Sequence, residues 1–231
     1  FINLPSLSAP QLASAADQLS GEVVAAAPQV ASSLMNPFMT TMFDHITSLS
    51  IGNDGTEAGS VVGPGPMPAQ AASYACGRPS HDKRGRGLSA FGGNGSTTGV
   101  SQGIGTTDVS MATAGVSGGL DFHVSPHFVV GLSGMGGHSS FDLSGDRGKG
   151  TSNAFEGGLY GLVHGTGFYV AAAGAYSSQN MTTDRTVVIP TVTPTGGDRL
   201  NASFTAQDYG ARLETGVYVN WLTPYIAVQT L

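Results

Sequence analysis

Apolar and polar positions alternate strictly along part of the second half of the chain. One set of alternate positions is apolar or small: Ala112, Ala114, Val116, Gly118, Leu120, Phe122 and Val124. The positions between them are mostly polar or glycine: Thr113, Gly115, Ser117, Gly119, Asp121 and His123. Successive side chains of a strand point to opposite faces, so this period of two predicts a β-strand with one apolar and one polar face.

Weaker forms of the same alternation predict further strands. Phe155, Leu159 and Val163 oppose Glu156 and His164 in one segment. We expect seven strands, at 86–96, 107–124, 128–142, 152–164, 168–182, 200–219 and 224–231. Several of them exceed the mean strand of soluble proteins, about 5–6 residues. They reach the roughly 9–11 residues that a tilted strand needs to cross a bilayer.

The connections between these strands alternate in length. Three are tight turns, within Ser125–His127, Gly165–Gly167 and Asn220–Pro224. Three are longer and polar, at Thr97–Thr106, Leu143–Gly150 and Thr183–Arg199. Outer-membrane barrels have short turns on the periplasmic side and long loops outside, so we expect the longer connections to face outside.

Aromatic residues gather beside the short turns. They are Phe122, Phe128, Phe168, Tyr169, Trp221 and Tyr225. Barrels that cross a membrane carry such rings at the boundary between lipid and water, so we expect a girdle here.

The first 50 residues follow a helical pattern. Ser8, Pro10 and Gln11 form a helix start signal, and Leu12 and Leu19 then share one face. A second helix is expected from Glu22 toward Met35. Asn36-Pro37 predicts a kink or a restart before the pattern continues to about residue 48.

Composition divides the chain into three zones. Residues 1–50 are the helical arm, 51–85 are a Gly- and Pro-rich linker, and 86–231 are the strand region. Charged residues make up 10% of the chain, against about a quarter in soluble domains. No stretch approaches the roughly 18 apolar residues of a membrane helix. A closed barrel satisfies its own backbone in lipid, so composition favours an all-β, antiparallel, up-and-down transmembrane barrel preceded by an α-helical arm.

Candidate chemistry adds little to this interpretation. The net charge of −6 speaks against nucleic acid as a partner, and Cys76 has no second cysteine to pair with. The histidines lack metal-ligand spacing, so we expect no metal, cofactor or catalytic residue.

Gly115–Gly119 fits the G-x-S-x-G pattern, which would make Ser117 the nucleophile of an envelope esterase. That motif needs a strand-to-helix turn, whereas Ser117 lies mid-strand, so we favour a chance match.

Charged residues occupy the polar faces of the predicted strands. They are Asp121, Glu156, Asp208, Arg212 and Glu214. If the apolar faces meet lipid, these side chains line a hydrated pore, where water or a threaded helix can satisfy them. The alternative is a soluble sheet with one wet face.

Three segments resemble the C-terminal translocator region of Gram-negative autotransporters (type V secretion). The helical lead-in Leu12–Glu22 is similar to the segment between passenger and barrel. Leu88–Gly95 is similar to the first barrel strand, although many members have Trp near the position of Leu88. Ala206–Glu214 is very similar to a strand in the middle of the barrel. The resemblance covers nearly the whole chain.

This resemblance implies a twelve-stranded barrel with a helix threaded through its pore, of which about seven strands are visible before Leu231. It implies a non-enzymatic translocator in the outer membrane that exports its own passenger, upstream of Phe1. Its expected partners are outer-membrane lipid and the barrel-assembly machinery. Self-cleavage at Asn36, as in some members, is less favoured than a helix-breaking role beside Pro37. A porin-like or adhesive barrel that binds ligands through its loops is the alternative function.

Overall fold

The structure is a computed structural model of the chain. It describes residues 7–19, 21, 26–50, 84–97, 108–145, 147–189, 197–219 and 222–231. The helices are α1 (Ala9–Leu19) and α3 (Ala27–Ser50). The strands are β1 (Arg84–Thr97), β2 (Val109–Ser125), β3 (Phe128–Leu143), β4 (Gly148–His164), β5 (Phe168–Val187), β6 (Asp198–Val217) and β7 (Tyr225–Thr230).

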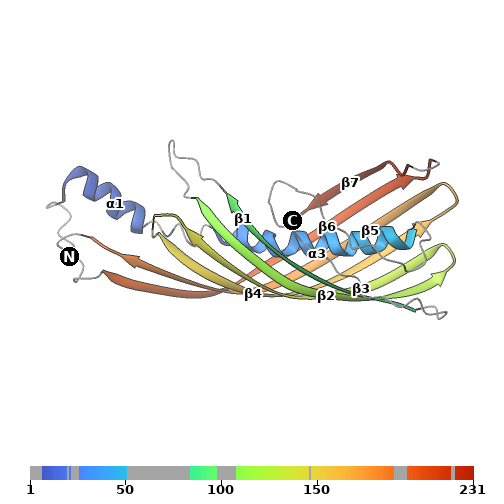
Figure 1. The fold of residues 1–231 in the computed structure, drawn as a ribbon, viewed down its shortest axis with the longest axis horizontal. Coiled ribbons are helices and arrows are strands. Elements are labelled where there is room, and N and C mark those ends of the chain that lie inside the picture. Colours follow the sequence, from blue (N-terminus) through green and yellow to red (C-terminus); the bar gives the residue numbers. More distant parts are fainter. Residues whose placement is uncertain are drawn as a thin grey trace.

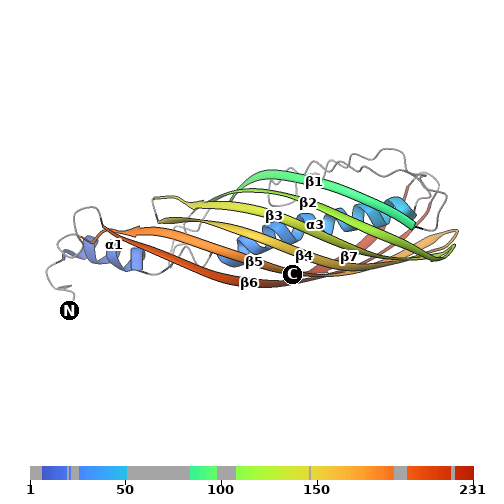
Figure 2. The ribbon, with the colours of Figure 1, turned by 90° about the horizontal axis from the view of Figure 1, so that it is seen from below.

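All seven strands form one antiparallel sheet in sequence order, from β1 to β7. The sheet is strongly curved, and α3 lies along its concave side (Figure 1, Figure 2). The prediction of an up-and-down antiparallel sheet with an N-terminal helical arm is confirmed. The sheet is an open part of a barrel, because β1 and β7 do not pair with each other.

The sheet exposes its apolar face and buries its polar face, which is the reverse of a sheet in a soluble protein. Large apolar side chains point away from α3 and are exposed, with Phe155 at 69%, Leu159 at 63% and Leu213 at 56%. Their neighbours Glu156 and Glu214 point toward α3 and are buried. A soluble sheet buries its apolar face, so this outward apolar face is built for contact with lipid.

Two connections differ from the sequence-based expectation. The predicted long loop at Leu143–Gly150 is wrong, because β3 ends at Leu143 and β4 already starts at Gly148. Leu143 and Gly148 are paired across the two strands, so this connection is a tight turn. The next strand, β5, continues to Val187, so the connection to β6 begins later than expected. Of the expected long loop Thr97–Thr106, residues 98–106 lie outside the described residues.

The helical arm has two parts in the described residues. Gln11 caps α1, since its Oε1 accepts bonds from the backbone N–H and the hydroxyl of Ser8, each at 2.9 Å. Pro37 lies inside α3, which runs on through it without a restart. Pro37 cannot donate to the carbonyl four residues earlier, and packing against the sheet holds the helix together across that gap. None of the helices in the described part of the chain is long and apolar enough to cross a membrane.

The first helix sits at the far end of the longest strands. Ala15 of α1 is buried against Val187 and Ile189, at the end of β5. Arg185 donates a 2.9 Å bond to the backbone carbonyl of Gln18. The Gln18 side chain accepts a 2.6 Å bond from the N–H of Val188. These contacts hold α1 against β5, beyond the part of the sheet that covers α3 (Figure 1).

The aromatic residues divide between the two faces. Phe122, Phe128 and Phe168 point outward near the short turns and are exposed, as expected for a girdle. Tyr169 is 1% exposed and faces α3, and Tyr225 shares its face because it pairs with Gly216. Those two residues therefore do not belong to an outward girdle. Trp221 lies outside the described residues.

A second aromatic pair marks the other edge of the apolar face. Tyr176 and Tyr209 are direct partners on β5 and β6, and their ring centres are 5.2 Å apart. Both are exposed, and Phe155 points outward nearby on β4. The apolar outward face is therefore bounded by rings at both ends, as in barrels that cross a membrane.

Two arginine substitutions on one face of β4 test whether that face meets lipid. Leu159 and Thr151 both point outward and are exposed, but only Leu159 lies between the two aromatic boundaries. We expect Leu159→Arg to destabilise the full-length protein by about 2–4 kcal/mol, and Thr151→Arg by about 0–1 kcal/mol. Urea unfolding in lipid vesicles measures both. Equal effects of the two substitutions would indicate a water-facing sheet.

Candidate functional site: the inner wall around helix α3

Helix α3 buries one continuous apolar stripe against the inner wall. The residues that are at most 3% exposed recur at helical spacing: Val30, Leu34, Met35, Phe38, Met39, Met42, Phe43 and Ile46. The N-terminal turn, with Val30, packs on Phe141 and Leu143 beside the β3–β4 turn. The C-terminal half packs near Leu162 and Tyr169, which flank the β4–β5 turn. The helix therefore runs along the inside from one end of the strands to the other.

Glycines across the strand ladder make room for this helix. Tyr160 pairs with Gly131, and a Cβ at Gly131 would lie 2.1 Å from the tyrosine ring. Phe141 covers Gly150 in the same way, and Tyr169 covers Gly216. Each ring therefore lies flat along the wall in the space that a neighbouring side chain would fill. The wall stays thin enough to leave the interior to α3.

A buried acid on β2 ties the helix to the wall. Asp121 is 1% exposed, and its Oδ2 lies 2.6 Å from Nε2 of His45 on α3. The hydroxyl of Tyr160 on β4 donates to its other oxygen. Both carboxylate oxygens thus have partners, as a buried acid requires.

A second set of contacts joins the middle of the wall to the helix backbone. Gln179 of β5 donates a 3.0 Å hydrogen bond to the backbone carbonyl of Ala31 on α3. Ser152 donates to Oε1 of Gln179 at 2.9 Å. Gln179 also donates to Ser177, and Ser177 donates to Glu156 at 3.1 Å. The chain of bonds leads from the helix to the buried carboxylate of Glu156, whose Oε2 has no hydrogen-bond partner among the described residues.

A third set of contacts between the wall and the helix lies on β6. Arg212 donates to Glu214 at 2.5 Å, and Tyr169 donates to the same carboxylate at 2.8 Å. The Arg212 guanidinium also lies 4.5 Å from the ring centre of Phe43 on α3. A cation over an aromatic face is attracted by it, so this pair links helix and wall a third time. Nearby, Gln229 of β7 donates to the side chain of Asn36 at 2.9 Å.

The structure brings the five predicted pore residues to one face. Asp121, Glu156 and Glu214 are buried, and Asp208 and Arg212 are half-buried, all on the side of α3. The sequence pattern found the charged members because they occupy the polar positions of the alternation. It missed three uncharged or helical partners, His45, Tyr160 and Gln179, because their roles depend on contacts between distant segments.

Ser117 does not sit in the geometry of an esterase nucleophile. It lies in the middle of β2, 5% exposed, with ordinary antiparallel pairing to Ser89 and Met135 on its two sides. A nucleophile elbow needs a sharp turn from strand to helix. Among the residues that the structure describes, no group of three or more His, Cys, Asp and Glu could hold a metal ion. Cys76 lies outside those residues.

Comparison with protein families agrees with this architecture. The autotransporter beta-domain model matches residues 88–230, most of the strand region. The chain belongs to the autotransporter β-domain family. No curated protein and no solved structure compared with the chain gives a match. The family identifies this autotransporter β-domain as an outer-membrane translocator of type V secretion, and the outward apolar face agrees with that environment.

Replacing one glutamine tests the contact between wall and helix backbone. We expect Gln179→Leu to lower the free energy of unfolding of the full-length protein by about 1–3 kcal/mol, because the Ala31 carbonyl and Ser152 lose a buried partner. Gln207→Leu is the matched control, since Gln207 is exposed on the outward face. Loss of the compact, heat-modifiable band on gels, followed against urea concentration, measures both. A helix that does not dock inside would make the two variants equal.

Proposed function

We propose that this autotransporter β-domain exports its own N-terminal passenger across the outer membrane and then holds α3 as a plug inside the barrel. The path of the chain carries this proposal. Helix α3 enters beside the β3–β4 turn and ends near the β4–β5 turn. β1 begins at that second end, because Arg84 pairs with Phe122. If the β3–β4 end faces outside, every residue before α3 is already at the cell surface.

The polar inner wall supports the same function. We assign Asp121, Glu156, Asp208, Arg212 and Glu214 to the pore lining, as the sequence predicts. Such side chains are costly in hydrocarbon and are satisfied by water or by a polar partner in a lumen. In the exported state His45, Phe43 and the Ala31 carbonyl take over part of that role. An unplugged porin or an adhesive barrel would have no use for these contacts.

In this proposal the three zones of the sequence have separate tasks. Residues 1–50 form the arm between passenger and barrel, 51–85 the linker from plug to first strand, and 86–231 the barrel wall. The wall inserts into outer-membrane lipid of a Gram-negative cell, with the barrel-assembly machinery as the expected partner. The passenger lies on the N-terminal side of the arm.

Two adjacent glycines on β3 test whether α3 occupies the pore. A Cβ at Gly137 would lie 2.8 Å from Leu34 of α3, whereas a Cβ at Gly136 meets nothing within 4 Å. We expect Gly137→Val to destabilise the full-length protein by about 1–3 kcal/mol through overpacking, and Gly136→Val to be tolerated. Protease resistance of the arm in purified outer membranes measures the docking. Equal resistance of the two variants would contradict a plugged pore.

Export itself is tested in intact cells with the full-length protein. We expect protease added outside to remove the passenger of the wild type and of Thr151→Arg, and to remove less of it from Leu159→Arg, which impairs insertion. In a Cys76→Ser background, a cysteine at Ser144 should react with an impermeant maleimide and one at Thr166 should not. Labelling only at Thr166 would reverse the orientation, and a protected wild-type passenger would refute export.

A further inference from the structure

The outward face of the sheet changes chemistry beyond the tyrosine pair Tyr176 and Tyr209. On the side of the β4–β5 turn it is apolar, as described above. On the other side it carries polar side chains, among them His138, Ser140, Thr151, Asn153, Asn180 and Thr182. They bond across the strands, as His138 does to Asn153 at 2.9 Å. Polar side chains in such a number are too costly to place in hydrocarbon. This part of the strands therefore lies beyond the hydrocarbon core of the membrane.

The height of this polar part follows from strand geometry. Asp184 lies eight residues beyond Tyr176 on β5, which is roughly 27 Å along the strand at about 3.4 Å per residue. A strand tilted by about 40° then rises roughly 20 Å above the tyrosine pair. The outward polar wall therefore stands at the level of lipid headgroups and above.

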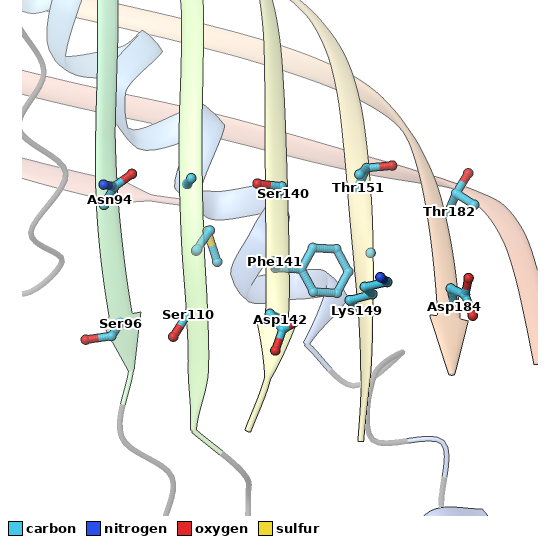
Figure 3. Close-up of a pocket in the computed structure, with 13 residues that line it drawn as sticks. Asn94, Ser96, Ser110, Ser140, Phe141, Asp142, Lys149, Thr151, Thr182 and Asp184 are labelled. Carbon is cyan, nitrogen blue, oxygen red and sulfur yellow. The ribbon is translucent and has the colours of Figure 1, made fainter. Parts of the chain in front are cut away.

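A groove of about 920 Å³ lies in this wall (Figure 3). Ala112 and Gly150 contribute apolar surface to it, and it borders Met111 and Phe141, whose side chains are buried on the side of α3. Hydroxyls on three neighbouring strands line it, from Ser140, Thr151 and Thr182. The groove is thus partly apolar, with groups that both donate and accept hydrogen bonds around it.

The charges at the rim of the groove cancel. Lys149 on β4 lies opposite Asp142 of β3 and Asp184 of β5 in the strand register. Arg199 in turn bonds Asp184, with its Nε 2.9 and 3.0 Å from the carboxylate oxygens. This balance gives no preference for a phosphate or another strongly charged group. A neutral ligand with many hydroxyls and exposed C–H groups, such as a sugar chain, fits both the lining and the charge.

The position of the groove on the outward face indicates which sugar chain it would bind. The groove continues the same outward face that carries Leu159 and Phe155, with no element of the described residues between them. A lipid whose acyl chains cover Leu159 therefore presents its headgroup to the wall above. We propose that this groove binds the saccharide headgroup of the glycolipid that surrounds the barrel in the outer leaflet. The inference rests on the proposed membrane function.

Photo-cross-linking in the full-length protein tests this contact. A benzophenone amino acid replaces Ser140 in the groove, Leu159 in the apolar band, or Thr166 in the opposite turn. Each protein is placed in vesicles of phospholipid and lipopolysaccharide, with either a complete core saccharide or one truncated to the innermost sugars. We expect Ser140 to give adducts that carry sugar, at least threefold more with the complete saccharide. Leu159 should cross-link lipid in both vesicles, and Thr166 should give no saccharide adduct.

The outcomes separate the two proposals. If Leu159 cross-links lipid but Ser140 captures the passenger, a second copy of the chain or nothing, the saccharide site is refuted and membrane insertion stands. If Leu159 captures no lipid, the membrane function itself fails. A Thr151→Trp variant, which narrows the groove beside Ser140, should reduce the Ser140 saccharide adduct at least threefold while leaving the Leu159 adduct unchanged. An undiminished Ser140 adduct in that variant would also overturn the proposal.

Discussion

Hydrocarbon offers no hydrogen bonds, and the rest of this structure follows from that one constraint. A strand in lipid must pair its backbone on both edges, which an antiparallel sheet in sequence order achieves strand by strand. The same constraint sends Asp121, Glu156 and Glu214 to the inner face, because only there can partners reach them. The outer face is then left to Leu159, Phe155 and similar residues.

The helix inside this wall replaces the core that a soluble domain would have. Its stripe from Val30 to Ile46 supplies the apolar packing, and the wall gives up volume by placing glycines under Tyr160 and Tyr169. Polar contacts lie at separate points along α3, among them Ala31, Asn36, Phe43 and His45. Burial of apolar area holds the helix, and the polar contacts fix where it stops along the lumen.

Sequence reasoning worked where the physical signal is local. The alternation in β2 predicted the inner and outer faces correctly, because apolar side chains suit lipid and polar side chains suit the lumen, and neighbouring residues point to opposite sides. It failed at Leu143–Gly150, because there Asp142 and Lys149 point outward while Leu143 is buried on the side of α3, so the apolar side of the alternation is reversed. It misplaced Tyr169 and Tyr225, because a ring near a turn does not reveal which way it points. The bond from Gln179 to Ala31 joins distant segments, and no local pattern predicts it.

The strict alternation of the strands also determines which changes in length the chain can tolerate. Inserting one residue in the middle of β4 would turn Glu156 toward lipid and Leu159 toward α3, together with every side chain beyond the insertion. Inserting two residues would keep each side chain on its own side and only lengthen the strand. Gene variants of this domain should therefore change strand length in steps of two, with odd changes confined to the connections. Such a wall must keep the odd or even position of each residue along its strand, more than the identity of individual residues.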